Sequence, residues 1–90
     1  MYNSVFEVKL TPQAERAYVR LDPETMERID RIFEQFEQGN LTHRNIRSLR
    51  GQYEGSFRYR LGKWRIIFRI DYAQRVVWVE AITTRGDAYR

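Results

Sequence analysis

Three segments of alternating apolar and polar residues in the second half of the chain most constrain its fold. Residues 57–61, 64–70 and 76–81 each place an apolar side chain at every second position. A period of two is typical of a β-strand with one buried face and one open face. The segments between them, a Gly-Lys pair and a five-residue polar stretch, have turn composition. This half of the chain therefore predicts three consecutive antiparallel strands.

The first half predicts one strand followed by two helices. Residues 5–10 alternate in the same way, and Thr11-Pro12 is a helix opening because Thr caps well and Pro is tolerated in the first turn. Asp22-Pro23 repeats this signal, and the helix that follows ends at Gly39. Residues 40–52 are interpreted as a polar connector. We therefore expect an α+β fold in one domain spanning 1–90, with an N-terminal strand, an α-helical hairpin, and then an antiparallel sheet of three further strands.

The periodicity also predicts which side chains form the core. On the last strand, Val77, Val79 and Ala81 are expected on one face, and Val76, Trp78 and Glu80 on the other. The expected core residues are Phe6, Val8, Leu10, Ile29, Phe33, Ile66, Phe68, Val77 and Val79.

The net charge of +4 is concentrated in the second half of the chain. Residues 1–45 carry a net charge of −2, from 6 Lys/Arg and 8 Asp/Glu, whereas residues 46–90 carry +6, from 10 Lys/Arg and 4 Asp/Glu. A cationic half favours a polyanionic partner, because each phosphate neutralised by the protein releases counterions. The alternative is a charge excess that only aids solubility.

Composition indicates a cytoplasmic protein that does not enter a membrane. The chain has no cysteine, which fits a reducing compartment. No apolar run reaches the roughly 20 residues of a membrane span, and the first residues lack the pattern of a signal peptide.

Four arginines alternate with the apolar residues of two predicted strands. Arg58 and Arg60 share one face of the first strand, and Arg65 and Arg69 share one face of the next. The turn that joins these strands brings both pairs onto one surface, with Lys63 at its end. Such a face suits a nucleic-acid backbone, although an ordinary solvated sheet face is the alternative. We expect Arg58, Lys63 and Arg69 to bind RNA.

The C-terminal residues add a second candidate group, Arg85 and Tyr89. Arg85 is suited to hold a phosphate. A phenol among several cations has its ionised form favoured, so Tyr89 is a candidate proton acceptor. The alternative is a frayed terminus with a loosely packed tyrosine.

Other chemistry finds little support in the sequence. His43 is the only histidine and lies in a polar segment, which indicates a surface residue rather than a base. There is no His/Cys cluster for zinc and no glycine-rich phosphate loop, so we expect neither a metal nor a cofactor.

The chain resembles the RelE/ParE superfamily of toxins from type II toxin–antitoxin systems. The resemblance rests on the run FRYRLGKWRIIFRID from Phe57 to Asp71, on the ending from Thr84 to Arg90, on the opening strand and helix, and on Leu49-Arg50-Gly51 before the core run. It covers nearly the whole chain, in order.

RelE-like toxins are ribosome-dependent endoribonucleases that cut mRNA in the ribosomal A site without a metal. The 2′-hydroxyl attacks the adjacent phosphate, while basic residues and a tyrosine provide the charge and the proton transfer. The resemblance thus implies a translation-inhibiting RNase with Arg60, Arg65, Arg85 and Tyr89 as catalytic residues. It also implies a cognate antitoxin as protein partner, possible hetero-oligomers with it, and the ribosome with its mRNA as target.

Two other functions remain open. ParE-like members share the fold but inhibit DNA gyrase without cleaving RNA. A degenerate toxin that only binds its antitoxin is a further alternative.

Overall fold

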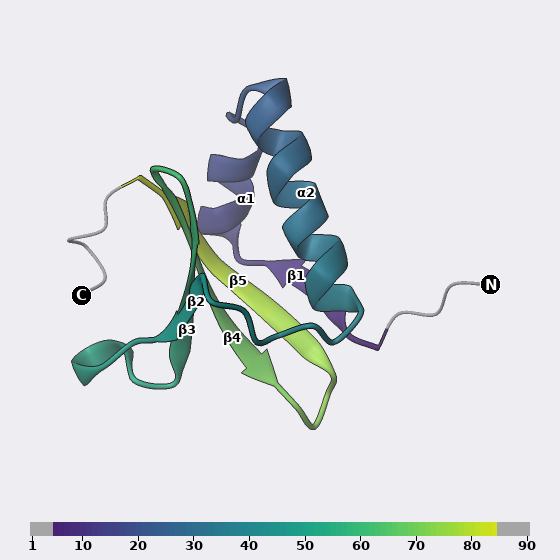
Figure 1. Cartoon of the computed structure of the whole chain (residues 1–90), viewed down its shortest axis with the longest axis vertical. Coiled ribbons are helices and arrows are strands. Elements are labelled where there is room, and N and C mark those ends of the chain that lie inside the picture. Colours follow the sequence, from purple (N-terminus) through teal and green to yellow (C-terminus); the bar gives the residue numbers. More distant parts are fainter. Residues whose placement is uncertain (1–4, 85–90) are drawn as a thin grey trace.

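The computed structural model describes residues 5–84 and consists of a five-stranded sheet with two helices (Figure 1). In chain order the elements are β1 (Glu7–Leu10), α1 (Pro12–Tyr18), α2 (Pro23–Glu37), β2 (Ile46–Ser48), the 3-10 helix η1 (Gly51–Tyr53), β3 (Ser56–Leu61), β4 (Trp64–Asp71) and β5 (Val76–Thr83). The α+β class and the order of strand, two helices and antiparallel strands are confirmed. In the described residues no helix is long and apolar enough to cross a membrane.

Both helices begin at the caps that the sequence predicts. The Thr11 hydroxyl accepts a hydrogen bond from the Ala14 amide, and the Asp22 carboxylate accepts one from the Thr25 amide. In each helix a proline follows the cap, where its missing N–H is not needed. After α2 the chain turns away at Gly39, whose φ of +80° is a conformation that glycine adopts without steric cost.

The strands lie in the order β1-β5-β4-β3-β2. The hairpins β3–β4 and β4–β5 are antiparallel, as expected, whereas β1 pairs in parallel with β5, with Val8 beside Val77. Parallel pairing requires a long connection, and the chain from β1 to β5 contains both helices and the other three strands. After β1 ends, the Thr11 amide and hydroxyl donate to the backbone oxygens of Val79 and Glu80, which holds α1 alongside the second half of β5.

The interpretation of residues 40–52 as a connector is incomplete. The segment contains β2, which pairs antiparallel with β3 and extends the sheet by one strand. A strand of three residues, of which only Ile46 is half-buried, is too short for its alternation to be visible in the sequence.

The prediction that Ala81 faces the core is wrong. Ile67 pairs with Ala81 but Phe68 pairs with Val79, so Glu80 is an extra residue in β5, a β-bulge. Beyond the bulge the two faces of β5 exchange roles. Ile82 joins the core next to Ile66, whereas Ala81 lies on the opposite face beside Ile67.

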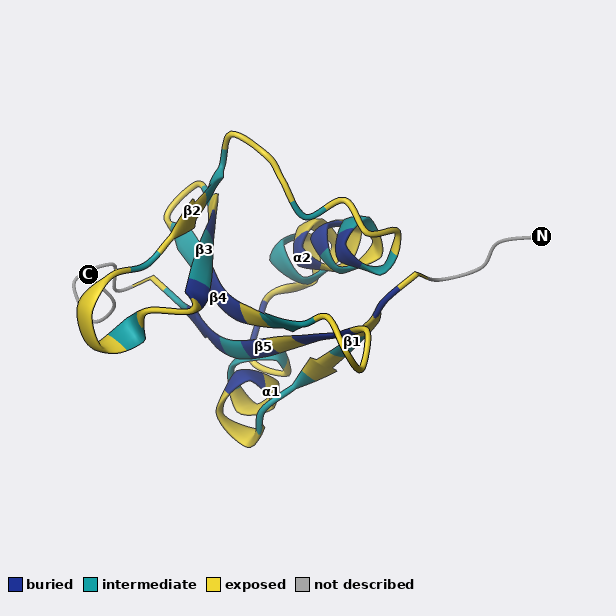
Figure 2. Ribbon diagram, turned by 90° about the horizontal axis from the view of Figure 1, so that it is seen from below, coloured by how far each residue is buried: buried dark blue, intermediate teal, exposed yellow. Residues whose placement is uncertain are grey.

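The core lies between the sheet and α2, which Figure 2 shows over one face of the sheet. Phe36 of α2 is fully buried, with its ring centroid 4.5 Å from Phe68 and 6.1 Å from Tyr59. Of the expected core residues, Val8, Leu10 and Phe33 are only partly buried and the other six are buried. We call the face of the sheet that α2 does not cover the open face.

Candidate nucleic-acid interface

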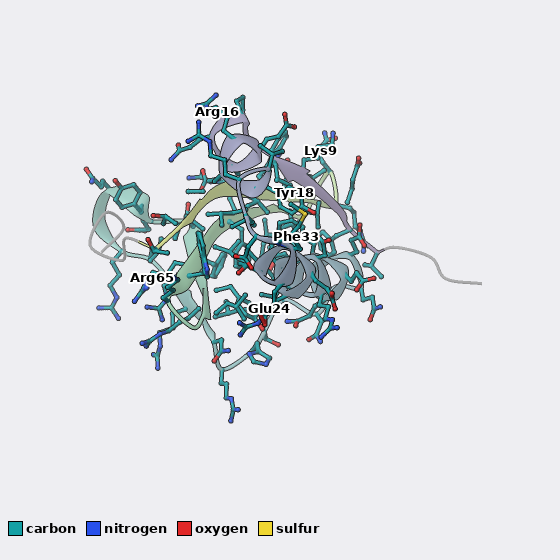
Figure 3. All side chains as sticks on the ribbon, turned by 90° about the horizontal axis from the view of Figure 1, so that it is seen from above. Lys9, Arg16, Tyr18, Glu24, Phe33 and Arg65 are labelled. Carbon is teal, nitrogen blue, oxygen red and sulfur yellow. The ribbon has the colours of Figure 1, made fainter. Side chains whose placement is uncertain are left out.

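The four predicted sheet arginines lie on the open face. Arg58 and Arg60 project from β3, and Arg65 and Arg69 from β4, at positions that alternate with the core residues Tyr59, Ile66 and Phe68. Arg60 and Arg65 are direct partners across the two strands. Figure 3 shows Arg65 at the side of the molecule away from Lys9.

The structure adds a fifth arginine that the sequence analysis did not identify. Arg47 of β2 pairs directly with Arg58 of β3 and therefore shares its face. We define the arginine cluster as Arg47, Arg58, Arg60 and Arg65. Arg47 was not predicted to lie on this face because residues 40–52 were interpreted as a polar connector, without a strand.

Arg58 lies at the centre of this cluster. Its burial, followed by the repulsion of Arg65, Arg60 and Arg47, lowers the pKa of the Arg58 guanidinium below its ordinary value. Arginine nevertheless stays protonated in proteins. The Nε of Arg58 is buried and has no hydrogen-bond partner among the described residues. A buried charged donor without an acceptor is costly, so Arg58 lowers the stability of the free protein.

No described carboxylate forms an ion pair with the arginine cluster. Arg69, which we expected to bind RNA, differs from the other sheet arginines. Its Nε lies 3.7 Å from a carboxylate oxygen of Glu80, and its guanidinium donates to the Ser56 hydroxyl at 3.4 Å. The same hydroxyl donates to Glu80 at 2.8 Å. Arg69 is therefore partly neutralised, whereas the arginine cluster is not.

Sequence alternation does not reveal the β-bulge at Glu80. Without the extra residue, the alternation would still place Glu80 on the open face but would move Ala81 to the core. The pairing of Glu80 with Ser56 depends on β5 and β3 lying on either side of β4, a property of the strand order.

Lys63 lies in the hairpin turn between β3 and β4. Gly62 has a φ of +59°, which permits a two-residue turn between the paired Leu61 and Trp64. Lys63 is exposed, and its backbone oxygen accepts a 3.4 Å hydrogen bond from Arg65. The turn therefore places Lys63 next to Arg65, as expected. The candidates Arg85 and Tyr89 lie outside the described residues.

His43 does not join the arginine cluster. His43 stacks on Tyr59 with a centroid distance of 5.6 Å, and its Nδ1 accepts a hydrogen bond from the Asn45 amide. Tyr59 belongs to the core face, so this histidine lies away from the arginines. Within residues 5–84 no group of three His, Cys, Asp or Glu side chains could hold a metal ion.

This arrangement is suited to bind a phosphate and to stabilise its negative charge. Guanidinium groups bind phosphate oxygens through paired N–H donors, and they are weakly hydrated compared with ammonium groups. An arginine cannot act as a base at neutral pH. Among the described residues of the open face, the cluster therefore provides electrostatic stabilisation and no proton acceptor.

Comparison with protein families gives one match over nearly the whole chain. The model of the ParE toxin of the type II toxin–antitoxin system parDE matches residues 8–89. A comparison with curated proteins gives no significant match.

Solved structures with the same fold include toxins and toxin–antitoxin complexes. The toxin–antitoxin complex RelBE2 from Mycobacterium tuberculosis contains a chain 26% identical to this one, with a TM-score of 0.69 over 89% of this chain and 98% of that chain. The RelE–RelB complex from Pyrococcus horikoshii is 21% identical, with a TM-score of 0.77 over 91% and 97% of the two chains. A double mutant of the E. coli toxin RelE in the free state is 14% identical, with a TM-score of 0.75 over 93% of this chain and 87% of that chain.

Proposed function

Because the chain belongs to the ParE toxin family of type II toxin–antitoxin systems, a branch of the RelE/ParE superfamily, we propose that it is a toxin that binds and cleaves mRNA on the ribosome. The observation that carries this proposal is the arginine cluster, a group of four cations on an open sheet face that has no carboxylate partner in the described residues.

The cluster fits the charge that develops during RNA cleavage. When the 2′-hydroxyl attacks the adjacent phosphorus, the bond to the 5′-oxygen breaks and a cyclic phosphate and a 5′-hydroxyl form. Negative charge grows on the phosphate oxygens in the transition state, and cationic donors already in place stabilise it. In this proposal Arg60 and Arg65, which face each other across the hairpin, contact that phosphate, and Arg58 and Lys63 hold the strand beside it.

Proton transfer needs a group outside the arginine cluster. We assign it to Tyr89, with Arg85 as a further phosphate contact. Tyr89→Phe keeps the ring and removes the hydroxyl, so the cleavage rate is expected to fall by about 10²–10⁴ if the hydroxyl accepts the proton. Cleavage at the full rate by this variant would exclude Tyr89 as the base.

Cell-free translation with added protein tests the proposed function. Mapping of mRNA ends should reveal cuts within translated codons, and none in the same mRNA without ribosomes. Arg65→Ala should lower the cleavage rate by about two orders of magnitude, the effect of removing one preorganised donor. Arg28→Ala, which removes an exposed charge from α2, is the matched control and should cleave normally.

A second candidate function, inhibition of DNA gyrase without RNA cleavage, is favoured by the match to the ParE family model. The same preparation should be added to a gyrase supercoiling reaction. Intact mRNA together with inhibited supercoiling would replace the RNase proposal with this one.

We further propose a cognate antitoxin as the protein partner, and the cytoplasm as the place of action. The support is the similarity to the toxins solved as RelBE2 and RelE–RelB complexes. Co-expression with the product of a neighbouring small reading frame should relieve growth arrest. Arrest that persists would show that the pairing is wrong.

A further inference from the structure

Trp78 is a large aromatic side chain on the open face that the core does not use. It is 37% exposed, whereas its neighbours Val77 and Val79 are fully buried on the other face of β5. The chain's other tryptophan, Trp64, packs against the core. The exposed indole is therefore not explained by packing.

Two cations flank the indole of Trp78. Lys9 of β1 is its direct partner on one side, with Nζ 5.7 Å from the ring centroid, and Arg69 of β4 is its partner on the other. Exposed aromatic rings between basic side chains on a sheet are the arrangement that binds unpaired nucleotides, because each base stacks on a ring while cations contact the backbone.

The position of Trp78 relative to the arginine cluster fits one continuous strand of RNA. Trp78 pairs with Arg69, and Arg69 lies four residues beyond Arg65 along β4. At about 3.3 Å per residue, Arg69 and its partner Trp78 therefore lie about 13 Å along the strands from Arg65. A single strand covers that distance with no more than about four nucleotides, given a rise of about 3.4 Å for stacked bases.

Glu80 determines which part of a nucleotide fits beside Trp78. Its carboxylate, held by Ser56 and close to Arg69, repels a phosphate but accepts hydrogen bonds from base amino groups. The surface there favours a base over the backbone, in contrast to the arginine cluster.

We infer that Trp78, between Lys9 and Arg69, is a stacking subsite for an unpaired base of an RNA strand whose phosphate lies on the arginine cluster. This inference rests on the proposed function, since it assumes that the open face binds RNA. Lys9 of β1 and Trp78 of β5 would then bind a nucleotide of the RNA that lies outside the reacting phosphate.

Binding of a fluorescent RNA octanucleotide, measured by anisotropy at low salt, tests the subsite. Trp78→Thr removes the ring and keeps a good strand former, so affinity should fall about tenfold, within the range for one stacked base. Trp78→Phe retains a ring and should lose less. An abasic residue scanned along the RNA should weaken wild-type binding at one position and have no further effect in Trp78→Thr.

Trp64→Phe is the control, because Trp64 packs on the core side of the sheet. Its RNA affinity should equal that of the wild type, and RNA should quench the fluorescence of the one remaining tryptophan.

The outcomes separate this inference from the proposed function. If Arg65→Ala abolishes RNA binding and Trp78→Thr leaves it unchanged, the subsite is wrong and the function stands. If the wild-type protein binds no RNA, the subsite is wrong, and mapping of mRNA ends in the translation reaction decides the proposed function by itself. Loss of binding to a protein partner in Trp78→Thr, with RNA affinity unchanged, also overturns the subsite and assigns the indole to a protein interface.

Discussion

Arg60 and Arg65 lie directly opposite each other across the β3–β4 hairpin, and Arg47 and Arg58 do the same across β2 and β3. Like charges opposite each other destabilise a sheet. No described carboxylate within ion-pair distance offsets this repulsion. The two pairs therefore reduce the stability of the free protein, and an anion bound between them would restore it. This is the property that an anion-binding site on the sheet face requires.

Replacing Arg58 with methionine should stabilise the free protein. Met retains a flexible chain of similar length and removes the partly buried charge whose Nε has no partner. We expect the free energy of unfolding to rise by about 0.5–1 kcal/mol, the scale of an opposed pair of like charges on a sheet. Urea denaturation measures it.

Inorganic phosphate provides the control for this interpretation. Phosphate should raise the melting temperature of the wild-type protein, because it binds only the folded state, and should raise that of Arg58→Met much less. Arg28→Met removes the same charge from the exposed surface of α2 and should behave as wild type. Equal stabilisation of Arg58→Met and wild type by phosphate would disprove an anion site at Arg58.

Sequence alternation predicted most of the sheet because β3 and β4 each have one apolar face and one face that carries arginines. It therefore placed Arg58, Arg60, Arg65 and Arg69 on one surface correctly. It failed where local pattern carries no information about neighbouring strands. Whether an arginine is free or paired depends on which strand lies beside it, so the contact between Arg69 and Glu80 was not predictable.

The bulge in β5 shows a second limit of sequence patterns. Val76 to Ile82 is apolar at most positions, so a one-residue shift in register leaves the pattern almost unchanged. Only the pairing with β4 shows that Ile82 faces the core in place of Ala81. Trp78, which lies before the bulge, was placed on the correct face.

Replacing Glu80 with glutamine should strengthen RNA binding and increase its dependence on salt. The change removes the carboxylate charge near Arg69, so Arg69 becomes available to a phosphate. One additional phosphate contact should steepen the slope of log K against log salt by about 0.7–1. Titrations with an RNA oligonucleotide at several salt concentrations measure the slope. Glu54→Gln, an exposed residue after η1, controls for the change in net charge, and an equal slope change there would contradict the role of Arg69.

Replacing Thr11 with alanine should destabilise the fold more than the loss of an ordinary helix cap. The hydroxyl accepts from the Ala14 amide and also donates to the backbone oxygen of Glu80, so it joins α1 to β5 at the bulge. Loss of a threonine cap costs about 1 kcal/mol, and the additional hydrogen bond about 1 kcal/mol more. Thr11→Ser keeps both hydrogen bonds and should recover most of this loss. Urea denaturation of the three proteins distinguishes these values, and a loss well below 1 kcal/mol in Thr11→Ala would show that the link to β5 contributes little.

The contact between the helices should make the protein sensitive to high pH. Tyr18 stacks on Phe33 between α1 and α2 (Figure 3), and its hydroxyl donates a hydrogen bond to Asp30, 2.5 Å away. That hydrogen bond, then burial, then the charge of Asp30 raise the pKa of Tyr18 to about 12. In the unfolded chain the phenol has a pKa of about 10. The stabilisation is therefore complete below about pH 10 and is lost as the pH rises towards about 12.

Tyr18→Phe should unfold with a weaker pH dependence in this range, and the difference in tyrosinate absorbance between the two proteins should give the pKa of Tyr18. In Asp30→Asn that pKa should move back towards 10. A value near 10 in the wild-type protein would show that the bond to Asp30 does not persist in solution.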